Sequence, residues 1–172
     1  MTAVLSLLSH STEASEYIGQ KLARYLKSGD ILTLDGDLGA GKTALTRGIA
    51  YGLGLTSPVS SPTFTVVIEH RAEKDGQLSL FHFDAYRLAD GDDFLDAGLD
   101  EYFAQKGVSV IEWGSLVENI LPDDRLCIFM RGTDETRAIE IAFPDARGKD
   151  LHHLQKDISD NIYITEIVLK QY

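Results

Sequence analysis

The sequence predicts an α/β domain with a mixed sheet, and three observations predict it. In the first half of the chain, short apolar segments typical of buried strands alternate with segments that have the spacing of amphipathic helices. A glycine-rich turn joins one of these strands directly to a helix. Later segments pair around turn-forming residues, as hairpins do. Strands separated by helices are typically parallel and hairpins are antiparallel, so we expect a mixed, mainly parallel sheet with late β-hairpins.

The N-terminal elements are a strand and an amphipathic helix. Residues 4–8 form the strand, and Ser11 or Thr12 caps a helix that extends to about Lys27. Glu13 is favourably placed in the first helical turn. Apolar residues recur along one face of this helix at a spacing of four: Ala14, Ile18, Leu22 and Leu26.

The next elements surround the glycine-rich turn. Residues 31–34 form a short buried strand, the turn occupies 36–41, and a second helix runs from 42 to about 53. Residues 63–69 are rich in β-formers, and a Lys-Asp-Gly-Gln turn connects them to a return strand at 78–83.

The second half of the chain is expected to contain short helices at 84–101 and a less patterned C-terminal extension at 144–172. The chain of 172 residues has the size of one domain, so we treat 1–172 as a single domain. The remaining expected elements are a buried strand at 108–111, a short helix at 116–120 and a second hairpin whose strands are 125–130 and 137–142.

The charge balance is strongly acidic. Asp and Glu number 27 against 16 Lys and Arg, which gives a formal net charge of −11 and a pI near 4.7. Such a surface repels phosphate backbones on average, so direct binding of nucleic acid through a broad basic face is not expected. The 44% of hydrophobic residues is typical of soluble globular domains and argues against disorder.

The sequence also limits the compartment. Cys127 is the only cysteine, so no internal disulfide and no disulfide partner is expected, in keeping with a reducing compartment. No apolar run approaches the roughly 18 residues of a membrane span, and the apolar N-terminal patch is too short for a signal peptide. We therefore expect a cytoplasmic protein without a membrane partner.

The glycine-rich turn has the pattern G-x-x-x-x-G-K-[ST], which is the P-loop, or Walker A motif: Gly36-Asp37-Leu38-Gly39-Ala40-Gly41-Lys42-Thr43. Its glycines let backbone N–H groups approach phosphates closely, and the helix that begins at Lys42 directs its N-terminal dipole at them. The Lys42 ammonium reaches the β- and γ-phosphates, and the Thr43 hydroxyl coordinates Mg²⁺. An apolar strand before the motif and an amphipathic helix after it provide the required context. The cofactors indicated are ATP and Mg²⁺, bound by a P-loop NTPase-like, three-layer domain.

A P-loop site also needs a carboxylate for Mg²⁺ or for the attacking water. Two carboxylates follow buried strands, Asp84 after 80–83 and Glu112 after 108–111, and either could instead cap the next helix or turn. Thr63, in the loop before the next strand, has a hydroxyl that could contact Mg²⁺ or the γ-phosphate. The alternative for Thr63 is a proline turn that opens a strand.

Other polar and aromatic residues have weaker assignments. His82 alternates with Phe81 and Phe83, which favours a hydrogen-bonded structural histidine over a metal ligand. Arg87 could stabilise phosphoryl charge or pair with nearby acids. Trp113, the only tryptophan, is expected in the core by default.

Four segments together resemble the TsaE (YjeE) family, a group of small bacterial P-loop ATPases that take part in the threonylcarbamoyladenosine modification of tRNA. These are the P-loop, Ser61-Pro62-Thr63-Phe64-Thr65, His82-x-Asp84-x-Tyr86-Arg87-Leu88 and Glu112-Trp113-Gly114. The resemblance covers roughly residues 5–142.

The resemblance implies a set of roles. ATP would lie across Leu38, Gly39, Ala40, Gly41, Lys42 and Thr43, with Thr12 near the nucleotide. Thr43 and Glu112 would hold Mg²⁺, while Lys42, Asp84 and Thr63 would complete the hydrolytic site. The family acts with the TsaB–TsaD heterodimer on the adenosine at position 37, so this chain would meet tRNA only through its partner.

Two other functions remain open on the sequence alone. A small-molecule kinase would share the P-loop, but the segment after Asp84 is acidic where kinases usually carry an arginine-rich lid. A nucleotide-controlled binding module would use ATP and ADP only to change its affinity for a partner. Residues 84–101 contain seven acidic residues and one basic residue, Arg87, and we expect this stretch to meet a basic partner surface.

Overall fold

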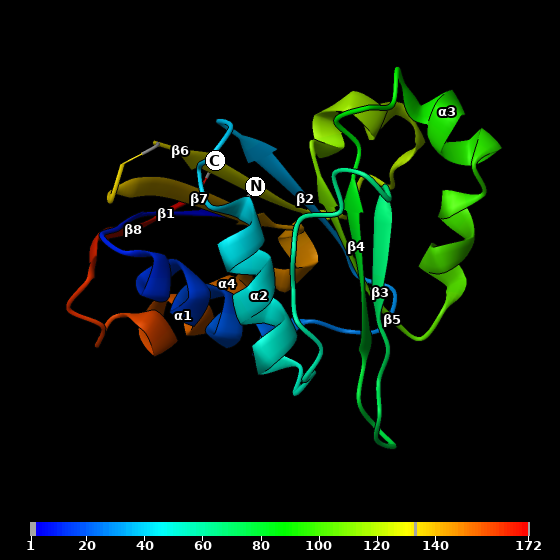
Figure 1. Cartoon of the computed structure of the whole chain (residues 1–172). Coiled ribbons are helices and arrows are strands. Elements are labelled where there is room, and N and C mark those ends of the chain that lie inside the picture. The colour runs from blue at the N-terminus through cyan, green and yellow to red at the C-terminus, as the bar shows by residue number, and fades with distance from the viewer. Residues whose placement is uncertain (1–2, 133, 172) are drawn as a thin grey trace.

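The computed structural model describes residues 3–132 and 134–171 (Figure 1). Eight strands form one sheet in the order β3-β4-β5-β2-β6-β7-β1-β8. Their bounds are β1 Ala3–Ser9, β2 Ile31–Gly36, β3 Val67–His70, β4 Ser79–Asp84, β5 Gly107–Glu112, β6 Leu126–Arg131, β7 Arg137–Phe143 and β8 Ile164–Gln171. Strands β4, β5, β2 and β6 are mutually parallel, and antiparallel strands extend the sheet on both sides. The mixed α/β sheet with a parallel centre and late hairpins is therefore confirmed.

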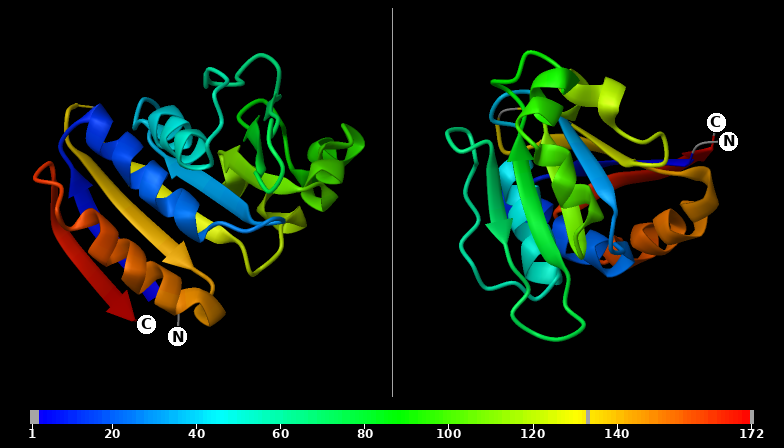
Figure 2. Two further views of the ribbon diagram at one scale, coloured as in Figure 1. Left: turned by 90° about the horizontal axis from the view of Figure 1, so that it is seen from below. Right: turned by 90° about the vertical axis from the view of Figure 1, so that its right-hand side faces the viewer.

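Helices cover both faces of the sheet, which gives three layers. On one face lie α1 Thr12–Leu22, α2 Lys42–Gly52 and α4 Gly148–Ile158, and Figure 2 shows α1 and α4 lying roughly along the strands that they cover. The other face carries α3 Gly91–Asp96 and the 3₁₀ segments η2 Leu99–Ala104 and η3 Gly114–Ile120. Two further 3₁₀ turns, η1 Ala23–Tyr25 and η4 Asp145–Arg147, join longer elements. Among the described residues, no helix is both long and apolar enough to cross a bilayer.

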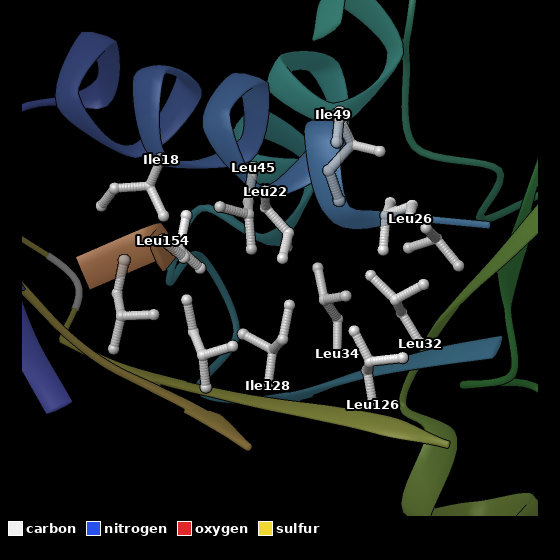
Figure 3. Close-up of a cluster of buried hydrophobic side chains, with 14 of the residues drawn as sticks. Ile18, Leu22, Leu26, Leu32, Leu34, Leu45, Ile49, Leu126, Ile128 and Leu154 are labelled. Atoms are coloured by element: carbon white, nitrogen blue, oxygen red, sulfur yellow. The ribbon is translucent and has the colours of Figure 1, made fainter. Parts of the chain in front are cut away.

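The main core lies between α1, α2, α4 and the centre of the sheet. Figure 3 shows aliphatic side chains of the helices, such as Ile18, Leu45 and Leu154, meeting Leu34 and Ile128 of the strands. All five are at most 1% exposed. Each such side chain contributes about 1.5–3 kcal/mol on burial. This core fixes α2, and with it the P-loop, on the sheet.

The structure differs from the sequence prediction in two segments. The strand expected at 63–69 begins only at Val67, because residues 63–66 form a turn in which Val66 has a φ of 64°. The expected helix to Lys27 is α-helical only to Leu22 and ends in a 3₁₀ turn. The short helices expected at 84–101 are α3 at 91–96 and η2 at 99–104, and the helix expected at 116–120 is the 3₁₀ segment η3, which starts at Gly114. The other predicted elements before residue 144 lie within two residues of their expected bounds.

The C-terminal extension contributes regular structure that the sequence pattern did not reveal. It forms α4, which buries Leu151, Leu154 and Ile158, and β8, which pairs with β1 along the edge of the sheet. Arg147 also forms hydrogen bonds to both Asp30 carboxylate oxygens at 2.8 and 2.9 Å. These contacts support our proposal that the whole chain is one folding unit.

A hydrogen bond between Tyr25 and Asp157 provides a test of this docking. The Tyr25 hydroxyl donates to Asp157 Oδ2 at 2.8 Å, and burial together with this bond raises the pKa of Tyr25 from 10.0 to about 12. The raised pKa means that the bond stabilises the fold fully below pH 10, and that this contribution is lost as the pH rises towards 12. Unfolding by urea should therefore show Tyr25→Phe less stable than wild type at pH 8, with the gap closing by pH 11.5. Tyr163→Phe, which changes an exposed tyrosine, should show no such pH-dependent gap.

Candidate functional site

The glycine-rich turn leaves β2 and enters α2 with the backbone geometry that its glycines allow. Gly36 has a φ of 131°, and a Cβ there would lie 1.9 Å from the carbonyl oxygen of Met130. Gly41, the N-cap of α2, has a φ of 92°. A side chain at either position would be strained, so both glycines are needed for this turn. The backbone N–H groups at the start of α2 are thereby left facing outward, where they can bind an anion.

A cavity of about 340 Å³ lies over this helix start, at the carboxyl ends of the parallel strands. The residues that line it are Leu38, Gly39, Ala40, Gly41, Lys42, Thr43, Ser61, Thr63, Asp84, Tyr86, Glu112 and Trp113. Every residue to which the family resemblance gives a role with ATP, Mg²⁺ or catalysis is among them except Thr12, and Arg87, the other candidate for phosphoryl charge, is not among them. Thr12 is the first residue of α1 and, within the described part of the chain, does not line the cavity.

Lys42 is held at the floor of the cavity. Its Nζ donates hydrogen bonds to the carbonyl oxygens of Asp37 at 2.8 Å and Gly36 at 3.3 Å, and it lies 4.4 Å from the centre of the Trp113 ring. Burial lowers the pKa of Lys42, and the carboxylates around it, Glu112 foremost, oppose that shift. A phosphate oxygen entering the cavity would offer this ammonium a full negative charge in place of neutral carbonyls.

Thr43 and Glu112 meet on the other side of the helix start. Strand β5 lies directly beside β2, so Glu112 at its end reaches Thr43 at the start of α2. The Thr43 hydroxyl donates to Glu112 Oε1 at 3.2 Å, and Glu112 is only 4% exposed. One hydroxyl and one carboxylate are oxygen donors of the kind that Mg²⁺ prefers.

The donor set suits a metal that arrives with its ligand. Within residues 3–132 and 134–171, no three His, Cys, Asp or Glu side chains gather to hold a metal by themselves. Mg²⁺ is usually held by one or two protein oxygens together with substrate phosphates and water. The Thr43–Glu112 pair therefore fits a magnesium–nucleotide complex better than a resident metal.

Asp84 and Thr63 form a second polar pair. Strand β4 lies beside β5 and ends level with it, since Asp84 is in register with Glu112. The Thr63 hydroxyl donates to Asp84 Oδ2 at 3.2 Å, and Asp84 Oδ1 accepts the Tyr86 N–H at 2.9 Å. The turn at 63–66 makes this contact possible, because the N–H of Val66 bonds back to the carbonyl of Pro62 at 2.8 Å.

The structure adds detail to four further residues. Trp113, expected in the core, is half-buried: it packs against the core on the α3 side and also lines the cavity beside Lys42. The Arg87 guanidinium stacks over the Phe64 ring at 4.9 Å. Ser61 and Tyr86 also line the cavity, although sequence reasoning did not assign them to the site; their adjacency to Thr63 and Asp84 was the available signal.

A second cavity, of about 270 Å³, lies against η3 and the exposed face of β6. Its arginine, Arg125, already donates to Glu118 Oε1 at 2.6 Å and to the Pro122 carbonyl at 3.0 Å. The acids Asp35, Glu118 and Glu140 also line it, so this cavity is poorly suited to a phosphate. The cavity over the glycine-rich turn is the candidate active site.

Comparisons with known proteins indicate the family of the chain. Residues 9–139 match the family model described as threonylcarbamoyl adenosine biosynthesis protein TsaE. The Bacillus subtilis protein named tRNA threonylcarbamoyladenosine biosynthesis protein TsaE is 46% identical, covering 87% of this chain and 92% of that protein. The Treponema pallidum protein of the same name is 39% identical over 78% of this chain and 98% of that protein. A crystal structure of YdiB from Bacillus subtilis superposes with a TM-score of 0.73 at 39% identity, covering 91% and 97% of the two chains.

Proposed function

Because the chain belongs to the TsaE family of tRNA threonylcarbamoyladenosine biosynthesis proteins, we propose that it is a Mg²⁺-dependent P-loop ATPase acting with the TsaB–TsaD complex. The observation that carries the ATPase proposal is the convergence of Lys42, the Thr43–Glu112 pair and the Thr63–Asp84 pair on one cavity. Phosphate-binding, metal-binding and water-positioning groups then lie on adjacent strand ends. A role in tRNA modification would place the protein in the cytoplasm.

In the proposed mechanism the P-loop residues bind the phosphates. The N–H groups at the start of α2 face the β-phosphate, and Lys42 exchanges the carbonyls of Gly36 and Asp37 for β- and γ-phosphate oxygens. Thr43 and Glu112 would hold Mg²⁺, which supplies neutralisation of the charge that develops on the phosphate oxygens. These interactions would stabilise the transition state in a partly closed site.

Asp84 would orient the attacking water in this proposal. Its carboxylate is 6% exposed and is held from both sides, by Thr63 at Oδ2 and by the Tyr86 N–H at Oδ1. A carboxylate fixed in this way can accept a hydrogen bond from a water opposite the leaving group. Thr63 belongs to an exposed turn, so its contact with Asp84 can respond to the γ-phosphate.

Exposed residues at the mouth of the cavity support the proposal of a protein partner. Three large apolar side chains stand in solvent around it, with exposed fractions of 84% for Phe64, 78% for Leu38 and 58% for Tyr86. Exposed apolar residues gathered in one place mark interaction sites. Phe64 and Leu38 belong to the turn at 63–66 and to the P-loop, which in this proposal contact the γ-phosphate, so a partner that covers them would sense the nucleotide state. This also favours nucleotide-controlled binding as a companion to hydrolysis.

The test is a steady-state ATPase assay with and without the purified TsaB–TsaD heterodimer. We expect slow hydrolysis alone, faster hydrolysis with the heterodimer, and dependence on Mg²⁺ in both cases. Transfer of labelled γ-phosphate to an acceptor other than water would replace the ATPase proposal with a kinase. Neither stimulation nor complex formation would refute the proposed partnership.

The acidic segment provides a prediction about the partner. Asp92, Asp93 and Asp96 are exposed on α3, which stands apart from α1 and α2 (Figure 1). If the partner is basic there, converting all three to Asn should weaken complex formation about 3- to 10-fold at low salt and less at high salt. Binding would be followed by calorimetry at two salt concentrations.

A matched control uses three exposed acids elsewhere. Changing Asp75, Asp123 and Asp124 to Asn removes the same net charge from other surface loops. Equal weakening by both triple variants would mean that only net charge matters, and no weakening by the α3 variant would make α3 a solvated surface without a partner.

A further inference from the structure

His82 is fully buried in β4, yet it is the residue that Glu112 contacts most closely. It is 0% exposed and lies between Phe81 and Phe83 along the strand. Its Nε2 is 2.8 Å from Glu112 Oε1, the oxygen that also accepts the Thr43 hydroxyl. Within the described part of the chain, the other ring nitrogen, Nδ1, is buried and has no hydrogen-bond partner.

The register of the strands explains how His82 reaches Glu112. His82 is paired with Val110 in the parallel β4–β5 ladder, and Asp84 is paired with Glu112. Residues two apart in a strand point to the same face, so His82, Asp84, Val110 and Glu112 share one face. The histidine therefore lies one step below the row of carboxylates at the strand ends and reaches Glu112 diagonally.

The single hydrogen bond defines the state of the ring. An ionised carboxylate only accepts hydrogen bonds, so the proton that is shared must be carried by Nε2 of His82. Nδ1 is a buried polar atom that makes no hydrogen bond within the described residues, so its removal from water is not compensated. A large apolar side chain would fill the same space without this desolvation cost. The bond to Glu112 is thus the contact that distinguishes histidine from an apolar residue at this position.

We propose that His82 is a positioning residue that orients the Glu112 carboxylate for the metal of a magnesium–nucleotide complex. By donating to Oε1, it fixes the rotamer of Glu112 toward Thr43 before any nucleotide binds. Hydrogen bonds behind a ligating group commonly set its orientation, and their loss typically lowers metal affinity about 10- to 100-fold. This inference rests on the proposed role of Glu112 at Mg²⁺ in the ATPase.

The test compares His82→Phe with His82→Gln. Phe keeps a flat aromatic ring, although a larger one, but removes the donor, whereas the Gln amide can place an N–H near the position of Nε2. Calorimetry would measure binding of a non-hydrolysable ATP analogue with EDTA and across a Mg²⁺ titration. We expect His82→Phe to need at least about 10-fold more Mg²⁺ than wild type for the half-maximal increase in affinity for the analogue. Its affinity for the analogue in EDTA should be unchanged. His82→Gln should restore most of the Mg²⁺ response.

His70→Phe is the matched control. His70 is another buried histidine, on the neighbouring strand β3, and one of its ring nitrogens also lacks a hydrogen-bond partner among the described residues, but its other ring nitrogen bonds to Ser57. It should lower stability without changing the Mg²⁺ requirement. Equal weakening of binding with and without Mg²⁺ in His82→Phe, or an unchanged Mg²⁺ requirement, would refute the positioning role. If wild type does not bind the analogue, the proposed function fails instead.

A spectroscopic measurement keeps the inference testable if His82→Phe does not fold. In wild-type protein, ¹⁵N NMR of the imidazoles should show His82 with its proton on Nε2 and with that proton protected from exchange. This signal should shift on addition of Mg²⁺ to the nucleotide complex and disappear as a protected signal in Glu112→Ala. A proton on Nδ1 instead would overturn the proposal, because Nε2 could not then donate to Glu112.

Discussion

Replacement of Lys42 by Ala is expected to abolish ATP hydrolysis, alone or with the TsaB–TsaD heterodimer. Lys42 is the cation at the floor of the cavity, and its Nζ already lies within hydrogen-bond distance of the P-loop carbonyls of Gly36 and Asp37. Removing a preorganised donor to a charge that develops in the transition state typically costs about 10²–10³ in kcat. Phosphate release measured at saturating ATP and Mg²⁺ should therefore fall at least about 100-fold.

The interpretation of this variant depends on its fold. Lys42 is 5% exposed, and its loss removes one donor each from the carbonyls of Gly36 and Asp37, of which Asp37 keeps the Ala40 N–H, so a modest loss of stability is expected as well. Thermal unfolding should show a cooperative transition for Lys42→Ala. Lys149→Ala, which changes an exposed lysine at the start of α4, should retain wild-type hydrolysis. Full activity in Lys42→Ala with the partner present would rule out the proposed mechanism.

The sequence predicts those parts of the site that the order of strands and helices determines. Carboxyl ends of parallel strands meet at one edge of a sheet, so residues that follow buried strands, such as Asp84 and Glu112, come together near the P-loop. The sequence could not show that Thr63 would bond to Asp84, since that contact depends on the turn at 63–66. The β-rich composition of this segment favoured a strand, but the backbone bonds to Pro62 override that local preference.

The C-terminal segment shows a different limit. Helix α4 has apolar residues at 151, 154 and 158, which is an amphipathic spacing in a short and otherwise polar segment. In β8, Glu166 has a φ of 51° and the register with β1 shifts between Ser6 and Leu8. An irregularity of this kind breaks the alternation of inward and outward side chains by which a strand is predicted. The local pattern is therefore weak although the segment is fully integrated in the sheet.

Glycines of α1 and α2 mark a close contact between the two helices that the spacing of apolar residues does not reveal. Gly52, the last residue of α2, lies at an interhelical contact, where a Cβ would be 2.5 Å from the Gln20 carbonyl oxygen. Gly48 of α2 and Gly19 of α1 lie at the same contact, each against the backbone of the other helix. A Cβ on Gly48 would lie 2.0 Å from the Glu16 carbonyl oxygen, and one on Gly19 would lie 2.2 Å from the Leu45 carbonyl oxygen. Helices α1 and α2 thus cross backbone to backbone.

Gly48→Ala should therefore strongly destabilise the protein, although alanine normally favours a helix. A Cβ 2.0 Å from a backbone oxygen cannot be relieved by a side-chain rotation, so α1 and α2 must move apart. Overpacking of this kind costs typically 1–3 kcal/mol and occasionally more, and we expect about 3 kcal/mol from urea unfolding. Because α2 begins at Lys42, its displacement should also weaken nucleotide binding in the fraction that remains folded.

Gly148→Ala separates this steric effect from helix propensity. Gly148 is the first residue of α4 and has helical backbone angles, and among the described residues an added Cβ would meet no heavy atom within 4 Å beyond its chain neighbours and its own helix backbone. There the same substitution should stabilise the protein by about 0.4–1 kcal/mol, because alanine restricts the unfolded chain. Opposite signs at the two positions would show that backbone contact between α1 and α2 holds the P-loop helix in place. A stable Gly48→Ala variant with unchanged nucleotide affinity would mean that the helices can separate without disturbing the P-loop.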